Sequence, residues 1–176
     1  CETYGLWGKV AAVSLEGQRE LAAAYRHLAR RRSVFALTAL YEPFGLAPLE
    51  AMAAGLPAVV TRNGGPSESL HDADTGEEFG VLVDPSDPGD IARGLLRLVG
   101  EPNEWSAFRE AGRRRVLGRY TWEHTAEGYL EVLEAIRRGE RAAPAEPAVP
   151  IPSYFGDPRP GNDIGLDELK RVFAGG

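Results

Sequence analysis

The stretch SVFALTALYEPFGLAPLEAMAAGLPAVVT, residues 33–61, holds two apolar runs of strand length with a helix-forming segment between them. The runs SVFALTAL and AVVT are continuous rather than alternating, which is typical of parallel strands covered on both faces. The segment LEAMAAG favours a helix that ends near Gly55, and Pro57 prevents its continuation. The stretch therefore predicts a strand, a helix and a second parallel strand, joined by a right-handed crossover.

The same alternation continues on both sides of this unit and predicts an α/β fold. Its order favours a Rossmann-like parallel sheet with helices on both faces. The further elements that we expect are a strand in KVAAVSL (9–15), a helix over 18–32, a short helix after RNGGPSE, a strand in GVLVD (80–84), and helices over 87–100, 103–117 and 121–138.

Apolar residues at intervals of three or four predict which side of each helix faces the core. Thr121 is the expected N-cap of the last helix, because its hydroxyl can accept a hydrogen bond from a free backbone N–H. The expected buried stripes are Leu21, Tyr25 and Leu28 in the first helix, Ile91, Leu95 and Val99 in 87–100, and Ala126, Tyr129, Leu133 and Ile136 in the last helix.

The composition changes after residue 140, where the proline-rich segment RAAPAEPAVPIPSYFGDPRPGND begins. We expect residues 1–140 to form one domain and residues 141–163 to form an extended linker or tail. Residues 164–176 contain LDELKRVF, which favours a short helix. The first residue is Cys1 rather than Met, so we expect the chain to be part of a longer protein.

Composition disfavours several classes of function. A formal net charge of −6 is unfavourable for binding nucleic acid, and no apolar run reaches the length of about 20 residues that a membrane span needs. One cysteine cannot form an internal disulfide, which suits a cytoplasmic location. His27, His71 and His124 lack the spacing of metal ligands. The arginine runs at 30–32 and 113–115 fall near helix ends, where we expect solvated side chains.

Chemically informative residues follow two neighbouring expected strands. Glu42 ends the first strand, and Asn63, Gly64 and Gly65 follow the second. In open α/β sheets, ligands bind outside the carboxyl ends of the strands. The helix that begins near Gly45 offers unpaired backbone N–H groups and the positive end of its dipole. This junction therefore predicts a site for an anion such as a diphosphate.

Glu50 lies about one turn into the same helix, where its carboxylate can accept two hydrogen bonds from the vicinal hydroxyls of a ribose. Glu42 would then face the group that the diphosphate carries, such as a sugar. A structural alternative remains open for each residue. A glutamate near a helix N-terminus is favoured by the dipole alone, and NGGP can be only a turn.

The joint pattern resembles the E-x7-E motif of retaining glycosyltransferases with the GT-B fold, here EPFGLAPLE. The resemblance to sucrose-phosphate synthases extends over about residues 8–138. It rests on residues 33–68, on FGVLVDPSDP and on RYTWEHTAEGYLEVL. The motif alone is weak evidence for the family. The match becomes specific through the flanking strand, the Gly–Gly–Pro loop and the downstream Tyr–Thr–Trp.

The resemblance implies transfer of glucose from UDP- or ADP-glucose to fructose 6-phosphate, with retention at the anomeric carbon and no required cofactor or metal. It implies that Glu50 binds the donor ribose and that Glu42 contacts the donor sugar or supports the leaving diphosphate. It also implies that the backbone amides of Phe44, Gly45 and Leu46 hold the phosphates.

The chain departs from the family pattern in its cations. Family members carry an Arg and a Lys upstream that stabilise the departing diphosphate, whereas the only lysines here are Lys9 and Lys170. The resemblance therefore implies that residues 1–140 are a partial nucleotide-sugar-binding domain, the C-terminal domain of a GT-B fold, whose N-terminal acceptor domain lies outside this chain. The alternatives are a retaining hexosyltransferase with another acceptor and a non-catalytic nucleotide-binding module. An NAD-type oxidoreductase is disfavoured, because no G-x-G-x-x-G follows the first expected strand.

Overall fold

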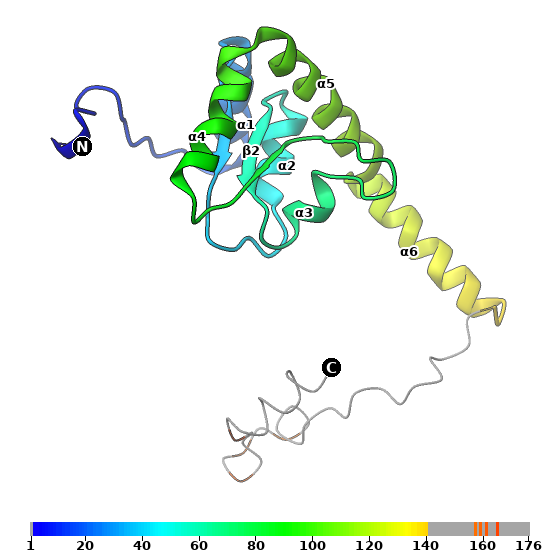
Figure 1. Cartoon of the computed structure of the whole chain (residues 1–176). Coiled ribbons are helices and arrows are strands. Elements are labelled where there is room, and N and C mark those ends of the chain that lie inside the picture. The colour runs from blue at the N-terminus through cyan, green and yellow to red at the C-terminus, as the bar shows by residue number, and fades with distance from the viewer. Residues whose placement is uncertain (1, 141–156, 158, 160, 162–164, 166–176) are drawn as a thin grey trace. The chain divides into compact units, whose positions relative to one another are not determined.

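The computed structural model describes residues 2–140 and the single residues 157, 159, 161 and 165 (Figure 1). The first compact unit of the chain ends at Glu127, and the second begins at Gly128, inside the last described helix. Most of the expected linker 141–163 and of the expected helix in 164–176 lies outside the described residues. The elements are η1 (Glu2–Tyr4), α1 (Gly17–Arg30), β1 (Phe35–Leu37), α2 (Leu46–Ala53), β2 (Ala58–Thr61), α3 (Pro66–Ser69), β3 (Val81–Val83), α4 (Pro88–Gly100), α5 (Pro102–Arg119) and α6 (Trp122–Arg137).

The sheet has three parallel strands in the order β1-β2-β3. Every residue of the central strand β2 is buried, which confirms the prediction from AVVT. The strand predicted in SVFALTAL is shorter than expected: only Phe35–Leu37 pairs, and Ala36 is exposed. Because β1 is an edge strand among the described residues, it is covered less completely than a central strand.

The strand predicted for residues 9–15 is wrong. These residues form no strand, and all of them are exposed. Val10 and Val13 are apolar enough for a strand, but no neighbouring strand in the described part of the chain pairs with them. An isolated strand leaves its backbone N–H and C=O groups without partners, so the apolar pattern alone does not produce one.

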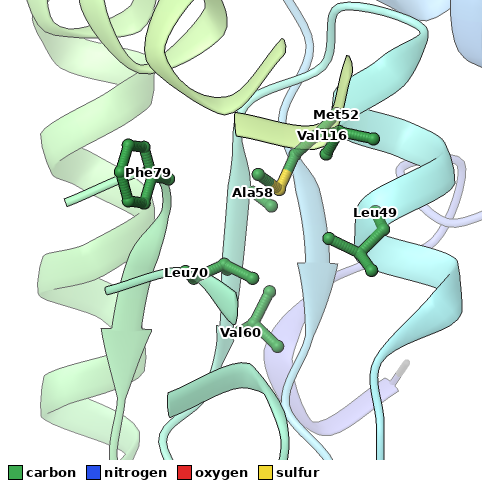
Figure 2. Packing of buried hydrophobic residues seen from close by; sticks show 7 residues of the cluster. All are labelled: Leu49, Met52, Ala58, Val60, Leu70, Phe79 and Val116. Carbon is green, nitrogen blue, oxygen red and sulfur yellow. The ribbon is translucent and has the colours of Figure 1, made fainter. Parts of the chain in front are cut away.

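Helices cover both faces of the sheet, as the sequence predicts. On one face Leu49 and Met52 of α2 and Val116 of α5 pack over Ala58 and Val60 of β2 (Figure 2). Leu70 and Phe79, which precede β3, complete this cluster. The opposite cluster consists of Val59, Val81, Val83, Leu98 and Phe108, and so involves α4 and the first half of α5.

Helix boundaries are predicted better than buried stripes. In α4 the innermost side chain is Leu98, whereas Val99 is exposed; in α1 Leu28 is exposed although Leu21 and Tyr25 are partly buried. The stripe predicted for the last helix is wrong. Its residues Ala126, Tyr129, Leu133 and Ile136 are all exposed. The apolar periodicity marks one face of α6 but does not determine whether another element covers it.

The N-cap of α6 is confirmed. The Thr121 hydroxyl accepts a hydrogen bond from the backbone N–H of His124 at 3.4 Å. A hydroxyl at this position satisfies one of the N–H groups that the first turn of a helix leaves unpaired.

An isolated parallel bridge between Glu42 and Gly64 continues the sheet beyond its strands. The Glu42 N–H donates to the Asn63 carbonyl at 3.0 Å, and the Gly65 N–H donates to the Glu42 carbonyl at 3.1 Å. Gly64 has φ 99°, and a Cβ there would lie 2.1 Å from the Glu42 carbonyl oxygen. The two loops after β1 and β2 can therefore touch only because residue 64 carries no side chain.

Replacing Leu98 by Ala should lower the free energy of unfolding by about 2–5 kcal/mol, because it leaves a cavity between α4 and the sheet. Leu98 is 1% exposed, whereas Leu96 in the same helix is 67% exposed. Leu96→Ala is the matched control and should change stability by less than about 0.5 kcal/mol. Urea unfolding followed by circular dichroism measures both changes, and equal losses would contradict the assigned packing.

Replacing Gly64 by Ala should cost considerably more than replacing Gly76, although both have positive φ. Gly76 has no atom within 4 Å of an added Cβ, so Gly76→Ala reports the cost of the left-handed backbone, about 1–2 kcal/mol. Gly64→Ala adds a clash with a backbone oxygen and should cost at least about 1 kcal/mol beyond that. Thermal unfolding of both variants checks the difference, and a similar loss in the two would show that the loops are not held in contact.

Candidate functional site

The carboxylate of Glu42 lies at the start of α2. Its Oε1 accepts a hydrogen bond from the Gly45 N–H at 2.9 Å and a longer one from the Phe44 N–H at 3.4 Å. Gly45 is the N-cap of α2 and has φ 93°, which turns the chain sharply into the helix. Glu42 therefore fixes the conformation of the strand–helix junction, in addition to any role that it has toward a ligand.

Two of the three amides that the family resemblance assigns to phosphate thus already have a partner. The third is the amide of Leu46, the first residue of α2, and it forms no hydrogen bond with the described residues. The Ala47 amide is likewise without a partner there, and Pro48 has none to offer. Backbone donors for an anion consequently remain at the first turn of α2, next to the positive end of its dipole.

Glu50 lies on the exposed side of α2, one turn from these amides. Burial raises the pKa of the Tyr25 phenol on α1, and the negative charge of Glu50 raises it further. Glu50 and Tyr25 also line one hollow of about 580 Å³, so the Glu50 carboxylate lies within the electrostatic reach of α1.

A hollow of about 460 Å³ adjoins Glu50 and the start of α2, and we call it the Glu50 hollow. Phe44, Leu46 and Glu50 contribute one wall, Gln18 of α1 lies at its border, and Tyr120 contributes from the end of α5. The remaining lining residues are Leu49, Ala53, Val116, Arg119, Thr121, Trp122 and Thr125. Its wall surface is mainly apolar, and Glu50 and Arg119 add opposite charges, a composition typical of small-molecule sites.

The glycine loop supports the other side of the junction. Asn63 donates through Nδ2 to the Leu40 carbonyl at 2.9 Å, which fixes the chain just before Glu42. A Cβ at Gly65 would lie 2.6 Å from the Phe44 carbonyl oxygen, so this loop also contacts the chain after Glu42. The structure therefore brings Glu42, Phe44, Gly45 and the loop together, and it places Glu50 one helical turn away.

Arg115 supports the site but was not identified from the sequence. Its side chain is only 11% exposed, so the prediction of a solvated arginine run is wrong at this position. It donates to the carbonyls of Glu68 and Ser69, which belong to α3 directly after the glycine loop, and it pairs with Asp72 at 3.4 Å. Its guanidinium also lies 4.5 Å from the centroid of the Phe79 ring. The arginine run was the only signal, because these partners are more than 30 residues away in the sequence.

Among the described residues, no group of three or more His, Cys, Asp and Glu side chains is arranged to hold a metal ion. No helix in the same part of the chain has the length and apolar character of a bilayer span.

Comparisons with curated proteins find sucrose-phosphate synthases. The Zea mays enzyme is 34% identical over 169 residues, which are 94% of this chain and 15% of that protein. Probable sucrose-phosphate synthase 5 of Oryza sativa subsp. japonica is 39% identical over 134 residues, covering 76% of this chain and 13% of that protein. The probable sucrose-phosphate synthase of Thermosipho melanesiensis is 41% identical over 120 residues, which are 68% of this chain and 26% of that protein. The chain thus spans between 13% and 26% of the length of these relatives.

Solved structures show the same fold. The sucrose-phosphate synthase from Thermosynechococcus elongatus aligns with a TM-score of 0.64 and 28% identity, over 78% of this chain and 33% of that one. The catalytic domain of starch synthase IV from Arabidopsis thaliana aligns with a TM-score of 0.52 over 74% of this chain and 28% of that one. Because the two sequences are 19% identical, this likeness concerns the fold alone. The family model for glycosyl transferases group 1 matches residues 2–115, so this chain belongs to the group 1 glycosyl transferases.

Proposed function

We propose that this chain is the donor-binding part of a retaining glycosyltransferase that transfers glucose from UDP- or ADP-glucose to fructose 6-phosphate, giving sucrose 6-phosphate. The observation that carries the proposal is the position of Glu50 in a hollow that begins at the free N-terminal turn of α2. The names of the relatives supply the acceptor, because the described residues hold no feature specific for fructose 6-phosphate.

The ribose of the donor would bind at Glu50. A carboxylate on the exposed side of α2 can accept hydrogen bonds from both vicinal hydroxyls, and the apolar walls of the Glu50 hollow suit the flat base. The diphosphate would then reach the free amides of Leu46 and Ala47 at the first turn of the helix. Neither the ribose nor these amides requires a bound metal, in keeping with the expectation that no cofactor is needed.

Glu42 would organise the junction around the diphosphate. Its carboxylate orients the Gly45 amide and holds the turn that exposes the Leu46 and Ala47 amides. Its negative charge next to the N-terminus of α2 also disfavours binding of any anion that makes no other contacts with the protein. In this proposal, the cations that stabilise the departing diphosphate and the acceptor site come from other parts of the enzyme.

Replacing Glu50 by Ala should lower the affinity for UDP roughly tenfold or more, because a charged hydrogen-bond acceptor for the ribose is lost. Calorimetry with UDP and with 2′-deoxy-UDP isolates this contact. The unchanged chain should prefer UDP, and Glu50→Ala should bind the two nucleotides almost equally. In the intact enzyme, the same change should raise the KM for UDP-glucose.

The matched control is Glu101→Ala, which removes an exposed glutamate at the start of α5, away from the Glu50 hollow. It should leave both affinities unchanged. If Glu50→Ala keeps the preference for UDP over 2′-deoxy-UDP, then Glu50 does not bind the ribose. If the intact enzyme forms no sucrose 6-phosphate from either donor, the proposed acceptor is wrong even where nucleotide binding holds.

A further inference from the structure

Arginine side chains from two helices far apart in the sequence share one hollow of about 370 Å³, which we call the arginine hollow. Arg26 and Arg30 of α1 and Arg32 just after it contribute from one side, and Arg109 of α5 contributes from the other. The remaining lining residues are Ala29, Ala54 and Trp105, so no carboxylate lines the hollow. It shares no lining residue with the Glu50 hollow, although a neighbouring hollow of about 580 Å³ is lined by Glu50 as well as by Arg26 and Arg109.

The charges in this hollow are poorly compensated by the protein itself. Arg109 pairs with Glu110 at 2.8 Å, but Arg26, Arg30 and Arg32 form no ion pair with any residue that the structure describes. Arg26 and Arg30 are one helical turn apart, a spacing at which like charges destabilise a helix. The chain carries 26 acidic and 20 Lys or Arg residues, so acidic partners are not scarce. Elsewhere Arg62 and Arg93 both pair with Asp90, which shows the arrangement that the hollow lacks.

Two of the guanidinium groups are held in place. Arg32 and Arg109 lie against the ring of Trp105, with 5.8 and 5.9 Å from each guanidinium carbon to the ring centroid. The indole is itself fixed, because its N–H donates to the Ser33 carbonyl at 3.0 Å. Side chains ordered in advance lose less conformational freedom when they bind a ligand.

The backbone at Arg32 supports the same arrangement. Arg32 has φ 55° and occupies the position after α1 at which glycine is the usual residue. The Arg32 N–H donates to the Ala29 carbonyl and the Ser33 N–H to the Leu28 carbonyl, which completes a Schellman motif. This left-handed conformation keeps the Arg32 side chain beside Trp105 despite its steric cost.

We propose that the arginine hollow formed by α1 and α5 binds a phosphate dianion, either inorganic phosphate or the phosphate group of a small phosphomonoester. Each guanidinium presents planar pairs of N–H donors that match two phosphate oxygens, and several of them together compensate a charge of −2. The volume accommodates a small organic group besides the phosphate. This site goes beyond the proposed donor site, because it uses guanidinium groups instead of the α2 amides and lies outside the Glu50 hollow.

Calorimetric titration of the chain with inorganic phosphate, in chloride buffer and in the presence of saturating UDP, tests this site. Phosphate should bind with UDP present, and Arg26→Gln and Arg30→Gln should each weaken it about tenfold. Both residues are exposed, so neither change should affect folding. The matched control is Arg19→Gln on the same helix, an exposed arginine outside the hollow, which should leave phosphate binding unchanged. A parallel titration with glycerol 3-phosphate distinguishes the two ligands of the proposal. If it binds more tightly than inorganic phosphate, the ligand is a phosphomonoester; if it binds more weakly, the ligand is the free ion.

Four results would overturn the proposal. Three of them are no phosphate binding at all, equal weakening by Arg19→Gln and Arg30→Gln, and complete displacement of phosphate by UDP. The last result would show that phosphate occupies the donor site instead. Glu50→Ala separates the two hypotheses, because it should weaken UDP binding and should not weaken phosphate binding, since a carboxylate near Arg26 and Arg109 is removed. Loss of phosphate binding in Glu50→Ala would therefore count against the arginine hollow and not against the donor site.

Discussion

The backbone contact between the Glu42 segment and the glycine loop is the constraint on which the candidate site depends. Parallel pairing of β1 and β2 brings the two loops to the same edge of the sheet, and the bridge between Glu42 and Gly64 then fixes their separation. In this position the Glu42 carboxylate accepts a hydrogen bond from the Gly45 amide. The course of α2, and with it the location of Glu50, follows from that one junction. Arg115 secures it from the other side by holding the chain just after the loop.

The sequence predicts the features that local chemistry determines. The helix between Gly45 and Gly55 follows from its glycines and prolines, and β2 follows from a short, fully apolar run. The motif also identified the residues that meet at the edge of the sheet, because parallel strands always place their carboxyl ends together. The assignment of Glu50 to a ribose remains a prediction, since only a bound nucleotide can test it.

What the sequence could not show depends on partners distant along the chain. Whether Val99 or Leu98 faces the sheet is decided by the direction in which α4 crosses it, not by the spacing of apolar residues. The segment at 9–15 has strand-like composition but no neighbour with which to pair among the described residues. Arginines show the same dependence most clearly. Arg115 is buried against α3, whereas Arg30 and Arg32 share a hollow with Arg109 of another helix.

The two candidate anion sites differ in how their charge is controlled. At α2 the donors are neutral backbone amides, and the Glu42 carboxylate beside them makes the local charge negative. A simple anion gains little there, because the carboxylates of Glu42 and Glu50 outweigh the one cation that lines the Glu50 hollow, Arg119. A nucleoside diphosphate adds ribose and base contacts in the Glu50 hollow, and these contacts offset the repulsion. Selectivity at α2 therefore arises from contacts to the nucleoside, whereas the arginine hollow selects for negative charge. Inorganic phosphate, which has no nucleoside, should therefore bind in the arginine hollow and not at α2.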